Sequence, residues 1–408
     1  MSTAPASPGT RKRLDHIDAM RPVKQAAVIS THTLIFFAPI ATNTTVIGLI
    51  MLTRFSREAF LFVSACMLTF SYRDVDKMKL NHYWKRRFIS VGVPYLAWTV
   101  IYFFYTTAHQ IQGFPYYSFS HTGVFGSVGL HYFLKLLRVG YYHLYYLIVI
   151  IEFYLIFPLL LKFVRKFSKW HVHMMVVALI WQVVFGWIVD SGPFGIQWTE
   201  VVQTRFVFAY VVYLIGGMVV ALHLEEVHDW IVAKARWIIA LTILSAVVAE
   251  VLSYLNHYHW LPSYLRTGTL VFAPAMIPFN VGAILCVYLL GVYLVAPQRR
   301  IRTRAMVQSG SDNSYGVYLS QMIWIPFLLR IRNHFGWHIP WELGVPLALF
   351  VVYFVGFIFT ALAARTVLAK ALTGRSQATW RSLMPKRHET PAMLHGDLGD
   401  GPLDVVNE

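Results

Sequence analysis

Residues 21–32 read RPVKQAAVISTH and open the first apolar segment of the chain that is long enough to cross a membrane. The stretch begins with a cation, Arg21, and ends with a titratable imidazole, His32. Eleven steps of 100° bring His32 to within about 20° of Arg21, so on a single helix the two side chains share one face. Along the axis they would lie roughly 16 Å apart. A histidine at membrane depth is costly unless it has a partner or a function.

Composition places the chain among integral membrane proteins. Hydrophobic residues make up 57% of the 408 residues and charged residues only 13%, whereas soluble proteins average about 25% charged residues. The sequence predicts an all-helical (all-α), polytopic protein, because backbone that spans lipid must satisfy its hydrogen bonds internally. We expect ten transmembrane helices, in the following ranges: about 22–42, 56–72, 89–107, 143–163, 173–190, 205–223, 237–255, 272–295, 313–331 and 345–368.

The basic residues predict how the protein is oriented. Lys and Arg number 35 against 19 Asp and Glu, which gives a formal net charge of +16. With the N-terminus inside, most of them fall in cytoplasmic segments of a cell (plasma or inner) membrane, and both termini are cytoplasmic. Charge that is scattered among short loops indicates contact with the lipid bilayer rather than with nucleic acid. The basic residues assigned to the outer side are Arg54, Arg57, Lys135, Arg138, Arg205, Arg266, Arg330 and Arg332.

The sequence predicts three parts: a cytoplasmic N-terminal segment (1–20), a ten-helix membrane domain (21–370) and a disordered cytoplasmic tail (371–408). The first part lacks the apolar core and cleavage site of a signal peptide. The last part combines glycine, proline and scattered charge, which is typical of disorder.

Two local patterns predict where helices begin. Pro22 suits the first position of a helix, so we expect segment one to start there, with Arg21 just outside it. Ser311, Asp312 and Asn313 are residues that favour helix N-caps, and they predict the start of the ninth span.

Four blocks of sequence resemble motifs of the membrane-bound acyltransferase 3 family. Arg21 and His32, with ten residues between them, are similar to the first motif. The other blocks are YWKRRFISVGVPYLAW (83–98), the run that starts YYHLYYL and ends FPLL (141–160), and SDNSYGVYLSQ (311–321). The blocks occur in the order of the family, so the resemblance covers roughly residues 13–368.

The resemblance implies an enzyme that takes an acyl group, expected to be acetyl, from cytoplasmic acyl-CoA. It implies that the acceptor is a hydroxyl, commonly on a cell-envelope or exported carbohydrate, and the chain looks closest to the branch that modifies exported polysaccharide. Three positions depart from the family pattern. Pro22 follows Arg21, Ser90 interrupts the basic motif, and Gln321 stands where many members have His.

His32 is the candidate general base. An imidazole, with a pKa of about 6.5, can take the proton of an acceptor hydroxyl and return it near neutrality. Transfer could be direct or pass through a brief acyl-imidazole, and the alternative to catalysis is a histidine that only packs between helices. Glu152 is the candidate acid that orients the imidazole from another helix, ranked above Glu250. The alternative for either carboxyl is a protonated, hydrogen-bonded group.

Two further groups are candidate binding residues. Arg21, Lys85, Arg86 and Arg87 could hold the phosphates of CoA bidentately or as point charges, although cations at this boundary are often membrane anchors. A carbohydrate acceptor could lie against two residues at the start of segment four, since aromatic faces and polar tips suit sugars; the alternative is an interfacial aromatic belt. These two residues are His143 and Tyr146.

No metal is expected, because His171-x-His173 and His257-x-His259 each lack a third ligand at useful spacing. The rival class is a transporter or flippase for a glycan or small metabolite, in which buried His and Glu would relay protons. That class predicts paired halves or broken helices, which the sequence does not show. A third reading keeps the acyltransferase and changes the acceptor to a secondary metabolite.

Overall fold

The computed structural model describes residues 14–40, 43–73, 78–109, 126–191, 205–258, 260, 274–296, 299 and 301–378. In these ranges all regular secondary structure is helical, which confirms the predicted fold class. The helices are α1 (Asp15–Phe37), α2 (Thr44–Thr53), α3 (Phe55–Ser71), α4 (Leu80–Arg87), α5 (Val93–His109), α6 (Ser127–Val139), α7 (Tyr145–Lys166), α8 (His171–Ser191), α10 (Val211–Leu222), α11 (Leu224–Ala233), α12 (Ala235–His257), α13 (Met276–Val295), α14 (Ile301–His334), α15 (Trp341–Ala363) and α16 (Ala369–Thr373). A π-helical turn, Phe88–Gly92, joins α4 to α5.

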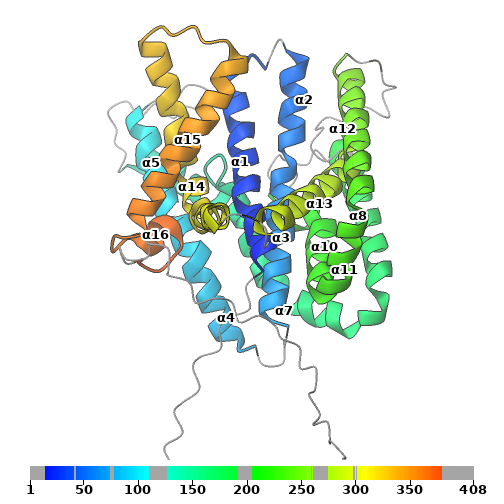
Figure 1. The fold of residues 1–408 in the computed structure, drawn as a ribbon. Coiled ribbons are helices and arrows are strands. Elements are labelled where there is room, and N and C mark those ends of the chain that lie inside the picture. The colour runs from blue at the N-terminus through cyan, green and yellow to red at the C-terminus, as the bar shows by residue number, and fades with distance from the viewer. Residues whose placement is uncertain are drawn as a thin grey trace, which may run out of the picture.

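Helix α1 lies in the middle of the bundle (Figure 1). It packs against α2, α3, α13, α14 and α15, so most of its circumference meets protein. This central position explains how a helix that carries Asp18, Lys24 and Gln25 can bury all three side chains. Polar groups on such a helix face protein or an internal cavity rather than lipid.

Six helical stretches are long and apolar enough to cross a membrane: Leu80–Thr106, Tyr145–Lys166, Ser168–Gly186, Ala235–Leu255, Met276–Val295 and Trp341–Ala363. A helix pair bent by 104°, Val207–Leu222 with Leu224–Ala233, would make a seventh. These seven stretches correspond to seven of the ten predicted spans. Their number and composition are typical of a multi-pass membrane protein. The number ten and the orientation of the termini stay predictions.

The three other predicted spans, 22–42, 56–72 and 313–331, coincide largely with α1, α3 and α14. Helix α3 has only 17 residues, while α1 and α14 carry charged side chains in their first halves. A short or charged helix can still sit at membrane depth when its neighbours are protein, but its length and composition alone do not show that it spans.

The predicted start of the first helix at Pro22 was wrong. Helix α1 begins at Asp15, and Pro22 lies inside it. Asp15 and Asp18 occupy the first turn, where carboxylates interact favourably with the helix dipole. Arg21 is therefore part of the same helix as His32, and the shared face that the spacing predicts applies to both.

The predicted cap of the ninth span was also wrong. Helix α14 runs without interruption over 34 residues, and Ser311, Asp312 and Asn313 lie within it. Asn313 and its neighbour Ser314 bond back to the helix: Asn313 Nδ2 donates to the carbonyl of Ser309 (2.8 Å), and Ser314 Oγ donates to that of Ser311 (2.9 Å). This local bonding lets capping residues sit in a helix interior.

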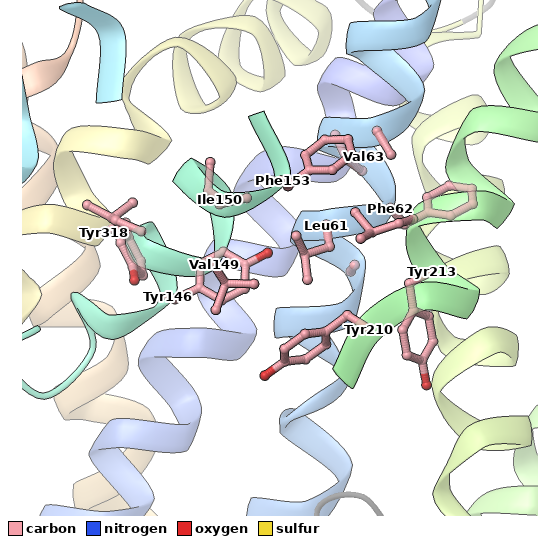
Figure 2. Close-up of a cluster of buried hydrophobic side chains, with 14 of the residues drawn as sticks. Leu61, Phe62, Val63, Tyr146, Val149, Ile150, Phe153, Tyr210, Tyr213 and Tyr318 are labelled. Carbon is pink, nitrogen blue, oxygen red and sulfur yellow. The ribbon is translucent and has the colours of Figure 1, made fainter. Parts of the chain in front are cut away.

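The main core forms where α3, α7, α10 and α14 meet (Figure 2). Leu61 of α3 and Phe153 of α7 have no accessible surface, and Tyr318 of α14 is almost fully buried. Close packing of this kind is the main attraction between helices in lipid. The core thereby fixes the positions of Tyr146 and Tyr318, which also belong to the site described below.

The segment after α15 folds back onto the bundle. Trp98 Nε1 of α5 donates to the carbonyl of Leu372 (3.1 Å), and the backbone N–H of Ala378 donates to that of Ala364 (2.8 Å). The predicted boundary between residues 370 and 371 falls inside α16, so residues 371–378 belong to the packed structure. The rest of the predicted tail, 379–408, and residues 1–13 of the predicted first part lie outside the described residues.

Candidate active site

A cavity of about 420 Å³ lies beside α1, bounded also by α3, α7 and α14. Within the described residues five cationic side chains and one carboxylate, that of Asp312, line it. The cations are Arg21, Lys24, Arg86, Arg87 and Arg375. Such a surplus of positive charge around a confined volume suits a ligand that carries several anionic groups.

The cavity brings together three of the four cations that the sequence predicts for CoA. Arg21 is held by an ion pair, with its Nη2 3.2 Å from Asp18 Oδ1, and its side chain keeps 34% of its surface accessible. Arg86 and Arg87 reach the cavity from the end of α4. Lys85, on the same short helix, is exposed and does not line the cavity.

Sequence reasoning missed Lys24 as a cavity residue. It is 3% exposed, and its Nζ lies 3.6 Å from the centre of the Phe60 ring. A desolvated ammonium over an aromatic face is a cation–π contact. The signal was present in the opening stretch RPVKQ, where a second cation follows Arg21 by three residues on a membrane-length segment.

Arg375 comes from the chain that follows α16. Its Nη1 donates to the carbonyl of Asp312 (2.6 Å), and its Nη2 lies 3.6 Å from Asp312 Oδ2. Gly374 turns the chain towards α14 with a φ of +69°, and a Cβ there would lie 2.8 Å from the carbonyl oxygen of Ser90. A glycine is therefore required to bring Arg375 into the cavity wall. The sequence analysis did not predict the position of Arg375, because it interpreted this segment as part of a disordered tail.

Aromatic side chains form the inner end of the cavity. Tyr146 and Tyr318 both line it, and each packs on Phe60, with ring centres 5.9 Å and 5.8 Å apart. The Tyr318 hydroxyl donates to the carbonyl of His143 (2.5 Å), and the rings of these two residues are 5.0 Å apart. The predicted pair His143 and Tyr146 thus lies at the boundary between the cavity and the region of His32.

His32 is surrounded by the loop that precedes α7. Its ring centre is 5.0 Å from that of Tyr142 and 6.4 Å from that of His143. Nδ1 of His32 is buried, with no hydrogen-bond partner in the described part of the chain, whereas the ring of His143 lies against the backbone of Tyr318 and Leu319. Buried polar groups are normally satisfied, so Nδ1 of His32 is available for a bound molecule.

The loop that presents Tyr142 to His32 has a strained backbone. Tyr142 has a φ of +34°, the one non-glycine residue with a positive φ among those described. Gly140 has a φ of +78°, and a Cβ there would lie 2.5 Å from the backbone nitrogen of Tyr145. A non-glycine residue in this region costs on the order of 1–3 kcal/mol and persists where the surroundings enforce it, often at functional sites.

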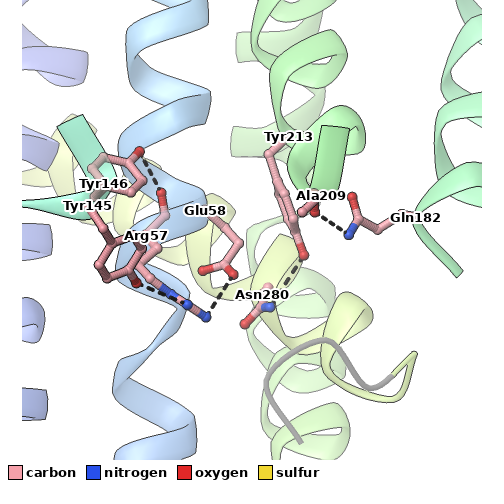
Figure 3. Close-up of polar contacts among 8 residues, drawn as sticks. All are labelled: Arg57, Glu58, Tyr145, Tyr146, Gln182, Ala209, Tyr213 and Asn280. Atoms are coloured by element: carbon pink, nitrogen blue, oxygen red, sulfur yellow. Dashed lines mark hydrogen bonds and ion pairs between the residues drawn. The ribbon is translucent and has the colours of Figure 1, made fainter. Parts of the chain in front are cut away.

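A buried ion pair lies next to this loop (Figure 3). Arg57 Nη2 is 3.5 Å from Glu58 Oε1, with side-chain exposures of 15% and 3%, and Arg57 Nη1 donates to the Tyr145 hydroxyl (3.4 Å). The charges of Arg54 and Arg57 are close enough to act on His32. The sequence analysis treated both arginines only as outer charges. The signal it missed is an Arg–Glu pair that enters an apolar segment, where charges require partners.

Glu152 lies elsewhere on α7. Its Oε2 accepts a hydrogen bond from the backbone N–H of Val207 (2.9 Å), at the start of the bent helix pair. In the described residues no carboxylate is hydrogen-bonded to His32, and the structure does not bring Glu152 together with it. Gln321 is fully buried, and both of its amide atoms lack a partner among the described residues. The same residues include no group of three metal-ligating side chains.

A comparison with protein families gives one match. The family model described as an acyltransferase domain, acyltransferase 3, matches residues 15–365, which is more than half of the chain. The matched range begins with α1 and ends just after α15, so it contains both His32 and most of the cavity wall. No curated protein matches the chain, and no solved structure does.

Proposed function

Because the chain belongs to the acyltransferase 3 family and is a membrane acyltransferase, we propose that it takes its acyl group from cytoplasmic acyl-CoA, with acetyl-CoA as the expected donor. The proposed acceptor is a hydroxyl of a cell-envelope or exported carbohydrate. The proposed site is the cell membrane, with both termini in the cytoplasm and ten helices embedded in the bilayer.

The observation that carries this proposal is the charge of the cavity and its place on α1. Five cations against one carboxylate suit the pyrophosphate and the separate phosphate of CoA, and Arg side chains bind phosphate bidentately. The cavity lies at the foot of the helix face that leads from Arg21 to His32. A donor whose phosphates rest on Arg21, Arg86, Arg87 and Arg375 would extend its acyl end towards His32.

The proposed chemistry is acyl transfer with His32 as general base. The imidazole takes the proton of the acceptor hydroxyl while the hydroxyl oxygen attacks the thioester carbon. The carbon–sulfur bond then breaks, the ester remains on the acceptor, and the protonated imidazole returns its proton to the leaving thiolate of CoA. The ring of Tyr142, 5.0 Å from that of His32, covers part of the imidazole, and a bound donor and acceptor would exclude water from the rest, which favours transfer over hydrolysis.

Other residues near His32 support this assignment. The tetrahedral intermediate carries negative charge on oxygen, and the guanidinium groups of Arg54 and Arg57 place positive charge in this region. His143, whose ring centre is 6.4 Å from that of His32, is proposed to bind the acceptor hydroxyl. Tyr146 is proposed to shape the passage, since its own hydroxyl already donates to the carbonyl of Arg57 (3.0 Å). Glu152 is proposed to anchor the start of the bent helix pair.

The test uses the purified protein in lipid vesicles with acetyl-CoA and an envelope-glycan fraction, and it measures released CoA thiol. We expect release that depends on the acceptor, and we expect CoA to raise the melting temperature by mass action. Acceptor-dependent release with a small hydroxylated metabolite but not with glycan would reassign the acceptor. Absence of both release and stabilisation, with several acyl donors, would contradict the proposal and favour a transporter.

A further inference from the structure

Gln25 lies on the face of α1 that joins Arg21 to His32. It follows Arg21 by four residues and precedes His32 by seven, so at 100° per residue it is within about 40° of both. Along the axis it is about 6 Å beyond Arg21 and about 10 Å short of His32. Gln25 does not line the cavity itself, but its level on α1 lies between the proposed phosphate site and the proposed reaction centre.

The amide of Gln25 has no partner. The residue is 0% exposed, and both Oε1 and Nε2 are buried without a hydrogen bond within the described part of the chain. An unsatisfied buried amide costs on the order of 1–3 kcal/mol for each lost bond. Native proteins rarely keep such a group unless a ligand or an ordered water completes it.

Other polar groups without partners continue towards His32. Ser311 Oγ and the Tyr315 hydroxyl line the cavity, and Nδ1 of His32 lies further along α1. Helix α14 packs closely on α1 at the lower level, where a Cβ on Gly310 would lie 3.2 Å from Pro22 Cβ. A donor that extended from Arg21 to His32, as proposed above, would pass close to these unpartnered atoms.

We propose that Gln25 binds the pantetheine arm of the donor, through the amide that is nearer to the phosphates. The proposal rests on acyl-CoA being the donor. Pantetheine carries two amide groups between the pyrophosphate and the sulfur, and a glutamine side chain both donates to and accepts from an amide. Because Gln25 is one helical turn from Arg21 and about two turns from His32, it meets the amide on the phosphate side.

The test compares Gln25→Met, a change of similar volume, with two donors. Acetyl-CoA carries both amides, whereas S-acetyl-N-acetylcysteamine keeps only the amide next to the sulfur. We expect the variant to raise KM for acetyl-CoA by about tenfold, as for one lost hydrogen-bonded contact, and to leave KM for the short donor unchanged. Without donor its melting temperature should be equal to or higher than that of the unchanged protein, since an unsatisfied amide has been removed.

Gln182→Met provides the matched control. Gln182 is also buried and does not line the cavity, and its Oε1 likewise has no partner among the described residues, but its Nε2 donates to the carbonyl of Ala209 (2.6 Å; Figure 3). This variant should melt at a lower temperature and keep both KM values. The opposite behaviour of two buried glutamines would separate a ligand-binding amide from a structural one.

Three results would overturn the inference. A Gln25→Met protein that melts at a lower temperature or does not fold would show that the amide is structural. An equal rise of KM for both donors, or no rise for either, would show that Gln25 does not bind the pantetheine arm. If the unchanged protein turns over both donors with the same KM, the CoA portion does not contribute to binding. The inference about Gln25 is then wrong, while the acyltransferase activity is still supported. If it turns over neither donor, the proposed function itself fails.

Discussion

Helix α1 passes through two regions that differ in charge, access and rigidity. The region around Arg21 is a cavity with cations from three separate segments of the chain, and its ion pair between Arg375 and Asp312 is partly exposed (45% and 33%). The region around His32 lies against aromatic rings and beside the buried pair Arg57–Glu58 (15% and 3%), and it is the more enclosed of the two. An open, charged region can bind and release a soluble donor, whereas a closed one can hold a reaction away from water. Donor binding and acyl transfer are therefore assigned to two different levels of helix α1.

The largest effect is expected on stability, from Glu58→Gln. This change leaves the Arg57 charge buried without its counter-ion, which typically costs about 3–5 kcal/mol. Asp312→Asn, which breaks the exposed pair, should cost less than about 1 kcal/mol. Thermal unfolding of both variants in the same detergent checks the contrast. Equal losses of stability would mean that the two regions do not differ in rigidity as described.

A change in the cavity around Arg21 should act on donor binding alone. Arg21→Gln removes one phosphate-binding guanidinium, so we expect KM for acetyl-CoA to rise by about tenfold with kcat nearly unchanged. Lys85→Gln, on the same side but outside the cavity, should change KM less than about twofold. Steady-state kinetics on both variants test this. A stronger effect of Lys85 would show that the donor binds along α4 rather than in the cavity.

A smaller effect is expected at the boundary between the regions. Tyr318→Phe keeps the ring against Phe60 and removes the hydrogen bond to the carbonyl of His143. The loss of one such bond, worth about 1 kcal/mol, should lower kcat by about fivefold through a less well-held His143, with KM for the donor unchanged. A rise of KM instead would place Tyr318 in the donor site.

The smallest effect is expected for Glu152→Gln. The amide oxygen can still accept the hydrogen bond from Val207, so kcat should fall less than about twofold. An acid that orients His32 would behave differently, because its loss lowers kcat by orders of magnitude. Turnover of this variant therefore decides whether Glu152 orients His32, as the sequence predicts, or only accepts the hydrogen bond from Val207.

Periodicity along one helix could be predicted from the sequence, but contacts between helices could not. The spacing of Arg21 and His32 predicts that they share one helix face, and both residues lie in helix α1. Lys24 and Gln25 stand in the same stretch, yet their importance appears only once α3 and α14 enclose α1. Arg375 reaches the cavity through a turn at Gly374, a tertiary contact that no local pattern reveals. The capping residues at 311–313 were misleading because packing of a long α14 overrides local preference.

The most direct test of this division is His32→Ala, measured for turnover and for donor binding in the same preparation. General-base catalysis contributes about 10²–10⁴-fold, so acceptor-dependent release of CoA should fall by that factor. Stabilisation of the protein by CoA should stay as in the unchanged protein, because the cations around Arg21 are intact. Turnover that survives the change would remove His32 from the chemistry, and a loss of stabilisation together with turnover would contradict the separation of the two regions.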